Sequence, residues 1–499
     1  AGLLGESLAV LRTSSVHRSA TSMPGSRPPS AASSRRASRM NPPNEEALLA
    51  GMDPVEVVDG QPSDDEAAPR PSLAWPIFSC MFYFLSAALT TPAMPRFVNS
   101  IANADGSTAV SQAGVELKGT FESVDQLMTF LFDPIWGVVS DRVGRRPLQV
   151  LSCVGMALGW ATVALGSPMW VLLAGRVLDG VTSCMLPICQ SSVKDMSAPE
   201  KLSANLGVLQ GVAIGAAFLI GGMAGGILAQ EAASPRTNFA VASAVAACAA
   251  VIIASCAPET LEERSRAPRV DWARANPVSS LSRLSRTRVC AGASMAYLLF
   301  WLGLNGLQVN LYNYTNLRYA WSPTQAVGLQ ASAGVVLACS NALGPRLLGP
   351  LIGQANVMRV GMAGFAAAMV AMGMSVTGPG FAASVIASSV ATMCLPGLTG
   401  LVAAEAQGDE AAAMLTALDS MSTLDRLVAY KAMSYIFARG IGWGLLGAHF
   451  YAGTACVLLG WVALEVALSS ARDKRPAGRT STIESESFPS RTSGQIVWK

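Results

Sequence analysis

Apolar segments of about 20 residues recur along most of this chain, and they restrict its fold more than any other feature. A helix of this length spans the hydrocarbon core of a bilayer, where only helices and closed barrels satisfy the backbone hydrogen bonds. Such segments follow one another with short connections from Leu73 onward. They predict an all-α membrane protein with twelve transmembrane helices, at residues 73–95, 119–139, 148–166, 169–190, 204–229, 238–257, 289–311, 325–345, 357–376, 380–403, 413–438 and 447–469.

The composition agrees with a membrane protein and argues against several other classes. Only 13% of the 499 residues are charged, whereas soluble domains carry about 25%. The ten cysteines stand alone in apolar stretches and only two histidines are present, so we expect neither a disulfide framework nor a metal site. The net charge of +3, without a basic stripe, argues against a nucleic-acid partner. No nucleotide-binding loop or hydrolase motif occurs, so we expect no enzyme activity and no cofactor.

Polar segments divide the chain into five parts. Residues 1–72 are rich in Ser, Pro, Ala and Arg, which predicts a disordered tail, and their basic start also fits an organelle-targeting segment. A linker at 258–288 separates six spans in 73–257 from six spans in 289–470, and residues 471–499 form a second disordered tail. The linker carries seven arginines, so the positive-inside rule predicts that both termini are cytosolic. Whether the membrane is the plasma membrane or an organelle membrane is left open.

The most specific motif runs from Gly137 to Pro147 and connects the second and third expected spans. Gly137 at a helix end permits a neighbouring helix to approach closely, and Gly144 permits a tight reversal. Asp141 suits a helix N-terminus, whose partial positive charge favours a carboxylate. Three arginines hold the loop at the cytosolic face, namely Arg142, Arg145 and Arg146. A plain basic hairpin is the alternative, but it does not account for the full pattern of glycines, acid and arginines.

The stretch from Leu127 to Arg146 resembles the signature loop of the major facilitator superfamily. Within that superfamily it is most similar to the tetracycline-resistance branch of drug:proton antiporters and to the eukaryotic hippocampus-abundant-transcript proteins. The other matching positions are Gly175-Arg176 with Gly180, Lys194-Asp195-Met196, Ala257 to Leu261, Asp271-Trp272 and Asn276-Pro277. The resemblance covers about residues 73–470. It implies two six-helix halves with a solute site between them.

The resemblance also implies roles for individual positions. Asp141 and the arginines of its loop would stabilise one of two access states through contacts with the second half, and Arg176 would take part in proton movement. The packing glycines would be Gly180 in the fourth helix and Gly221, Gly222, Gly225 and Gly226 in the fifth.

The chain departs from the family in three ways. Gly222 replaces a proline that antiporters usually have, Asp179 is an acid where the family usually has none, and Gly344 to Gly353 repeats the loop motif only weakly.

Ionisable residues inside the expected spans are candidates for function, because a charge at the bilayer centre is costly unless it faces a partner or a cavity. Asp179 lies near the middle of its span, three residues after Arg176, so the two side chains can pair. This pair is either a proton-coupling carboxylate with a basic neighbour or a structural ion pair. Asp125 with Glu122, and Asp133, lie nearer the ends of the second span, and we expect them to be interfacial and solvated.

The eleventh span carries a polar stripe at helical spacing, formed by Asp419, Ser422, Arg426 and Tyr430. We expect this stripe to line the solute cavity or to contact the Asp141 loop, and the alternative is a partly solvated helix. Asp419 and Asp425 are further candidates for proton coupling.

In the seventh span, the amides of Asn305 and Gln308 suit hydrogen bonding to an organic solute.

Together these features predict a monomeric, multi-pass membrane transporter that moves a small organic solute by alternating access. Without a nucleotide site, uphill transport must use an ion gradient, and we expect protons as the coupled ion, with antiport favoured. The partners are then the solute, protons and the lipid bilayer. Two alternatives stay open: an uncoupled facilitator of the same fold, and a transporter-like sensor or chaperone that moves no solute.

Overall fold

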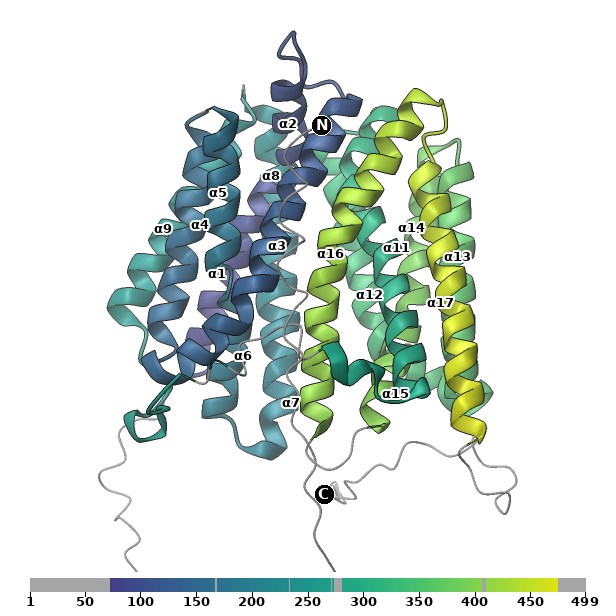
Figure 1. Ribbon diagram of the computed structural model, residues 1–499. Helices are drawn as coiled ribbons and strands as arrows, with labels where there is room; N and C mark the ends of the chain where they lie inside the picture. Colours follow the sequence, from purple (N-terminus) through teal and green to yellow (C-terminus); the bar gives the residue numbers. More distant parts are fainter. Residues whose placement is uncertain are drawn as a thin grey trace, which may run out of the picture. The chain divides into compact units, whose positions relative to one another are not determined.

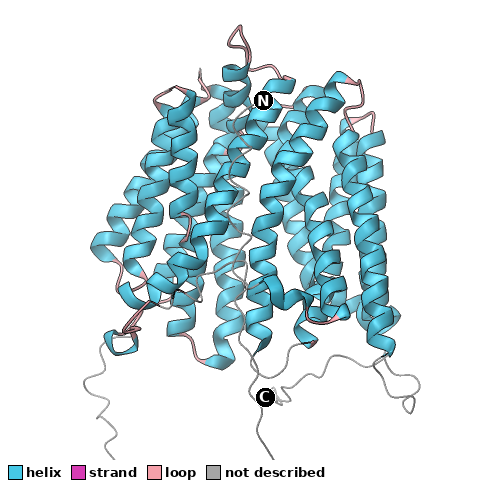
Figure 2. Ribbon diagram, in the orientation of Figure 1, coloured by secondary structure: helices cyan, strands magenta, loops and turns pink. Residues whose placement is uncertain are grey.

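Helices make up nearly all of the described part of the chain, and no strand occurs in it (Figures 1 and 2). The computed structural model describes residues 72–473, apart from 167, 233, 271, 273–280 and 406–409. Almost all of the two expected tails lies outside these residues, as does part of the expected linker with Asp271, Asn276 and Pro277.

Two sets of helices follow one another along the chain. The first set is α1 Ala74–Thr90, α2 Met94–Ala102, α3 Gln112–Val143, α4 Arg146–Ala164, α5 Met169–Thr182, α6 Met185–Met196, α7 Pro199–Val208, the π-helical segment η3 Leu209–Ile214, α8 Gly215–Glu231 and α9 Arg236–Cys256. Two 3-10 turns follow, η4 Glu263–Ser265 and η5 Ser282–Ser285. The second set is α11 Arg288–Tyr319, α12 Pro323–Ile352, α13 Gln354–Met374, α14 Gly378–Ala391, the 3-10 turn η6 Thr392–Cys394, α15 Leu395–Ala404, α16 Glu410–Gly442 and α17 Ala448–Asp473.

Each expected span coincides with one helix or with a broken helix. The first span is broken between α1 and α2, which meet at a bend of 41°. Pro92 lies in this break, and a proline removes a backbone donor and clashes with the preceding turn of a helix. The fifth span contains the π-helical segment between α7 and α8. It therefore deviates from regular helix even though Gly222 stands where the family's proline is expected.

In the described part, nine helices are long and apolar enough to cross a bilayer, and the bent pair α1–α2 brings the number to ten. The helices α3 and α16 are not among them. Both carry several charged side chains that face the interior of the bundle, as shown below. The all-α membrane fold is thus confirmed, whereas the number twelve depends on α3 and α16 and stays a prediction.

The two sets form two halves, each with its own apolar core. The first half, α1 to α9, buries side chains such as Phe97, Trp160 and Phe239 against one another. The second half, α11 to α17, does the same with Phe300 and Phe365 among others. Figure 1 shows α3 and α16 side by side where the halves meet, and hydrogen bonds between these two helices agree.

The halves are bonded to each other at one end of the bundle. Lys118 of α3 donates to the backbone oxygen of Val309 at 2.7 Å, and Ser123 donates to the backbone oxygen of Leu427 at 3.0 Å. Further bonds at the same end join Lys431 to Thr120, Asn99 to Asn313 and Thr324 to Gln230. We call this the bonded end. The Gly137–Pro147 stretch lies at the other end of α3, which we call the hairpin end.

The glycines of α8 form two faces that pack on different neighbours. A Cβ atom on Gly221 or Gly225 would lie 2.8 Å or 2.5 Å from backbone oxygens of α1. A Cβ atom on Gly222 or Gly226 would lie 3.1 Å or 3.2 Å from atoms of α12 in the second half. The glycines of α8 thus permit close packing on α1 in its own half and on α12 in the second half. Gly180 of α5 is packed as closely on α3, because its Cβ position is 2.5 Å from the backbone oxygen of Asp125.

The substitution Gly225→Ala should destabilise the protein by about 1–3 kcal/mol, because the added methyl group overpacks a backbone contact that has no side chain to move. Gly215→Ala in the same helix is the matched control, since no atom lies within 4 Å of its Cβ position. The measurement is the melting temperature of each purified variant in detergent. Equal melting temperatures for the two variants would contradict the close packing of α8 on α1.

Candidate functional site

The Gly137–Pro147 stretch forms a tight hairpin between α3 and α4. The helix α3 continues to Val143, Gly144 takes a φ of 109°, and α4 begins at Arg146. Arg145 holds the hairpin together, because its Nη1 lies 2.8 Å from Asp141 Oδ1 and its Nε lies 2.9 Å from Asp195 Oδ2 at the end of α6.

Glu259, which follows α9, occupies the N-terminus of α4. Its carboxylate accepts hydrogen bonds from the backbone N–H groups of Arg145 at 2.8 Å and Arg146 at 3.1 Å. A carboxylate is stabilised there by the free N–H groups and the partial positive charge of the helix end. We expected this place for Asp141, and that expectation is wrong, since Asp141 lies in the last turn of α3.

Two other expectations concern the neighbours of the hairpin. The contact of its charges with the second half was expected in one of two access states and stays a prediction, whereas the close approach at Gly137 does not occur in this structure. The described ion pairs of Arg145 end on Asp141 and Asp195 in the first half, not on the second half. Gly137 has no atom within 4 Å of its Cβ position, so it makes no close approach to a neighbour. Both results fit a bundle in which the hydrogen bonds between the halves, among the described residues, lie at the bonded end. In the second half, Gly353 takes a φ of 81° between α12 and α13, so the weak repeat of the motif keeps its glycine turn.

The substitution Gly144→Ala should lower stability by about 1–3 kcal/mol through backbone strain alone. The total loss should be larger, because the added Cβ would also clash with Glu259. The Cβ position lies 2.4 Å from Glu259 Oε2. Gly106→Ala is the control for strain alone, because Gly106 has a φ of 68° and open space around it. Thermal unfolding of both variants checks this, and a smaller loss for Gly144→Ala than for Gly106→Ala would contradict the clash.

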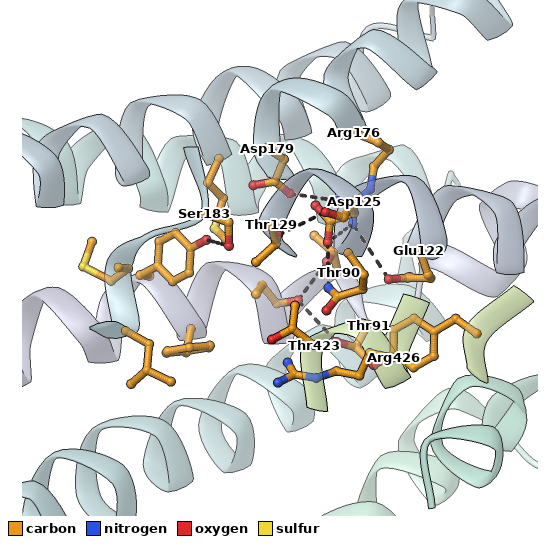
Figure 3. Close-up of a pocket in the computed structure, with 18 of the residues that line it drawn as sticks. Thr90, Thr91, Glu122, Asp125, Thr129, Arg176, Asp179, Ser183, Thr423 and Arg426 are labelled. Carbon is orange, nitrogen blue, oxygen red and sulfur yellow. Dashed lines mark hydrogen bonds and ion pairs between the residues drawn. The ribbon is translucent and has the colours of Figure 1, made fainter. Parts of the chain in front are cut away.

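A cavity of about 370 Å³ lies between the two halves (Figure 3). Its lining comes mainly from α1, α3, α5 and α6 on one side and from α11, α12 and α16 on the other. It extends from Lys118 and Tyr312, near the bonded end, to Gln190 and Asp419, nearer the hairpin end. Its volume falls in the range of about 300–1,000 Å³ typical of small-molecule sites.

Arg176 of α5 stands at the centre of a buried charge cluster in this cavity. Its Nη1 lies 2.8 Å from Asp179 Oδ2, and its Nη2 lies 3.1 Å from Asp125 Oδ2 and 3.8 Å from Glu122 Oε2. The guanidinium also stacks over the ring of Trp160, 4.9 Å from its centre, a favourable cation–π geometry. Figure 3 shows the three carboxylates converging on this one cation. We call Arg176, Glu122, Asp125 and Asp179 the Arg176 cluster.

The cluster holds more acids than bases. Lys118, one helical turn before Glu122, is buried and donates to a backbone oxygen of the second half rather than to a carboxylate. Asp125 Oδ1 is buried and accepts no hydrogen bond from the described residues. Even with Lys118 included, full ionisation leaves one excess negative charge. One proton would neutralise it.

Asp125, Glu122 and Asp133 are therefore not the solvated interfacial groups that we expected, and that prediction is wrong. Asp125 and Glu122 pair with Arg176, and Asp133 lines the cavity with a buried Oδ1 that accepts no hydrogen bond from the described residues. The sequence contained the signal that we missed. Lys118, Glu122, Asp125, Thr129 and Asp133 follow one another at intervals of three or four residues, which places them on one face of α3.

The polar stripe of α16 faces this cavity. Asp419, Arg426 and Tyr430 line it, together with Thr423. Figure 3 places Arg426 and Thr423 across the pocket from the Arg176 cluster. Ser422 is buried and accepts a hydrogen bond from Arg426 Nη2 at 3.4 Å.

The remaining candidates divide between the cavity and the core of the second half. Gln308 of α11 lines the cavity. Asn305 instead donates to Asp425 Oδ2 at 2.8 Å, and both residues are buried away from the cavity lining. Asp425 Oδ1 accepts no hydrogen bond from the described residues. Asn305 is thus the partner of a buried acid and not a cavity residue in this structure.

Known proteins resemble this chain in both sequence and structure. The tetracycline resistance protein, class H, of Pasteurella multocida is 30% identical over 140 residues, which cover 28% of this chain and 33% of that protein. Major facilitator superfamily domain-containing protein 10 of Bos taurus is 34% identical over 113 residues, which cover 23% of this chain and 25% of that protein. The matched stretches thus span a third or less of these curated relatives.

Solved structures match over much more of their length, at low identity. The human organic anion transporter MFSD10 (TETRAN) superimposes with a TM-score of 0.58 and 21% identity, covering 79% of this chain and 98% of that one. A bacterial homolog of the human lysosomal transporter Spinster, in an inward-facing and unoccupied conformation, gives a TM-score of 0.63 and 14% identity, covering 80% and 96%. These matches show a shared fold. A family model described as Major Facilitator Superfamily matches residues 77–430, which is more than half of the chain. The chain therefore belongs to the major facilitator superfamily.

Proposed function

We propose that this protein is a secondary transporter that moves a small organic solute across a membrane by alternating access. The cavity between the two halves is the observation that carries this proposal, because halves bonded at one end leave the other end free to admit a solute. The names of the relatives, tetracycline resistance proteins and an organic anion transporter, support the same activity.

We further propose that transport is coupled to protons, with antiport favoured. The groups that would share the proton are Glu122, Asp125 and Asp179, which face Arg176, with Lys118 on α3 and Tyr83 on α1 close by. One proton removes the excess negative charge of the Arg176 cluster taken together with Lys118. A proton that changes the charge of the cavity changes the relative free energies of the two access states if it binds one of them better. Asp419 and Asp425 are the second-half candidates for the same role.

The hairpin would then act on the access state. We propose that the hairpin end faces the cytosol with both termini, so that the present state is open toward the cytosol. When that end closes, α3 and the hairpin would approach the second half, and Asp141, with its half-exposed carboxylate, would gain a partner there. Gly137, which faces open space now, would come into contact in the same movement.

Flux measurements with purified protein in liposomes test the proposal. A panel of organic solutes is added outside vesicles that contain a pH-sensitive dye, with and without an imposed pH gradient. Saturable solute flux that is accompanied by proton movement in the opposite direction is the expected result. Saturable flux whose rate does not depend on the pH gradient would instead favour the uncoupled facilitator. The absence of the antiporter proline at Gly222 agrees with that alternative. Absence of flux for every solute would favour the sensor or chaperone alternative.

A further inference from the structure

The charges that line the cavity point to the chemical class of the solute. Eight ionisable side chains other than tyrosine line it: Lys118, Glu122, Asp125, Asp133, Arg176, Asp179, Asp419 and Arg426. Five are acids and three are bases, so the fully ionised cavity carries two excess negative charges. A cavity lined by an excess of one sign of charge favours bound charges of the opposite sign, because its walls focus the electric field.

These charges fall into two groups, each with one excess negative charge. The first is the Arg176 cluster with Lys118, whose carboxylates are ion-paired with Arg176. The second consists of Asp133 on α3 and Asp419 and Arg426 on α16, which line the same cavity from the two halves. No described ion pair joins Asp133, Asp419 or Arg426. The second group is therefore short of a cation and has oxygens available to bind one.

The carboxylate of Asp133 can accept a further hydrogen bond. Its Oδ1 is buried and accepts no hydrogen bond from the described residues. A buried carboxylate oxygen without a partner is costly, and native structures usually supply that partner. No group of three or more potential metal ligands exists among the described residues.

The rest of the lining suits an organic group attached to the cation. Aromatic rings surround the cavity, among them Phe84, Phe218, Tyr312 and Tyr430. Such rings bind organic cations through their faces as well as through apolar contact. Three methionines, Met94, Met156 and Met185, add adaptable apolar surface.

We propose that the solute is a monovalent organic cation, and that Asp133 and Asp419 bind its cationic group, one carboxylate from each half. This inference rests on the proposed transport function. It leaves the Arg176 cluster free to hold the proton, so the two excess charges of the cavity serve two different ions. A cation held between α3 and α16 also attracts both halves to the same point, which favours closure of the hairpin end around the solute.

A pair of probes with the same shape and opposite charge tests this inference. The cation 1-methyl-4-phenylpyridinium and the anion biphenyl-4-carboxylate each consist of two linked rings. Equilibrium binding of radiolabelled probe to the purified full chain is measured first, and flux of the same probes into liposomes is measured separately. We expect saturable binding of the cation and weak or no binding of the anion.

Substitution then locates the binding group. Asp133→Asn and Asp419→Asn should each weaken binding of the cation by about tenfold or more, as expected when one member of a buried charge pair is removed. Asp133→Glu and Asp419→Glu keep the charge and should recover a large part of the affinity, which separates lost charge from misfolding. Asp105→Asn, at an exposed position in the loop after α2, is the control and should bind as the wild type does.

The two measurements separate the inference from the function that it rests on. Binding of the anion but not the cation, or cation binding that both Asp→Asn variants retain in full, would overturn the inference whatever the flux. Cation binding without flux of either probe would support the cation site and contradict transport. Flux of the anion alone would support transport and overturn the cation site.

Discussion

Replacing Asp179 with Asn should reduce flux driven by a pH gradient to the level of protein-free liposomes. Asp179 is buried and bonded at 2.8 Å to Arg176, the centre of a cluster that together with Lys118 carries one excess negative charge when fully ionised. The amide removes that charge permanently and imitates the protonated acid, so the protein can no longer respond to a proton gradient at this site. The variant should still fold, because the substitution relieves an excess of like charge rather than creating one. The measurement is initial flux into liposomes with and without the gradient.

Asp105→Asn is the matched control for this experiment, because it makes the same chemical change at an exposed loop position. It should leave gradient-driven flux unchanged. If Asp179→Asn kept wild-type flux with full dependence on the gradient, the proton-coupling role of Asp179 would be rejected. The pair Arg176–Asp179 would then be structural, and the remaining candidates would be Glu122, Asp125, Asp419 and Asp425.

Replacing Arg176 with Gln should destabilise the protein by about 3–5 kcal/mol, because removing one partner of a buried ion pair leaves uncompensated charge in the interior. The side chain of Arg176 is 5% exposed, and three carboxylates depend on it. Most of the variant should be lost during purification, and any that remains should melt at a lower temperature. The measurement is the thermal unfolding of the detergent-solubilised protein.

Compensating substitutions make this prediction sharper. Asp125→Asn combined with Asp179→Asn in the Arg176→Gln background removes two of the carboxylates and should restore part of the lost stability. Arg176→Lys keeps the charge and should lie between the wild type and Arg176→Gln. A thermal stability of Arg176→Gln equal to that of the wild type would contradict the account of the cluster as a set of mutually dependent charges.

Periodic apolar segments predicted the helices of this protein well, since the length of a membrane span depends mostly on local composition. Two helices show the limit of this approach. The charges of α3 and α16 look unfavourable for a membrane in the sequence, yet four of those on α3 and two of those on α16 line the cavity between the halves. The pairing of Arg176 with Asp179 was also predictable, because residues three apart on a helix are neighbours.

Contacts between distant segments decided the rest of the candidate site. Glu259 caps α4 from more than 110 residues away in the chain, and nothing local to the hairpin indicates this. Asp425 and Asn305 are 120 residues apart and satisfy each other inside the second half. The polar face of α3 was readable as a stripe, but its partner Arg176 lies on α5, and only the packing of the two helices brings them together.

The most direct test of the central claim measures distances at both ends of the bundle in the same protein. Spin labels on the exposed residues Lys194 and Arg346 report on the hairpin end, and labels on Asp105 and Arg318 report on the bonded end. Adding a transported solute with a proton gradient should shorten the first distance and lengthen the second, because alternating access closes one end as it opens the other. Distances that both lengthen or both shorten, or that stay fixed while flux proceeds, would contradict alternating access in this protein.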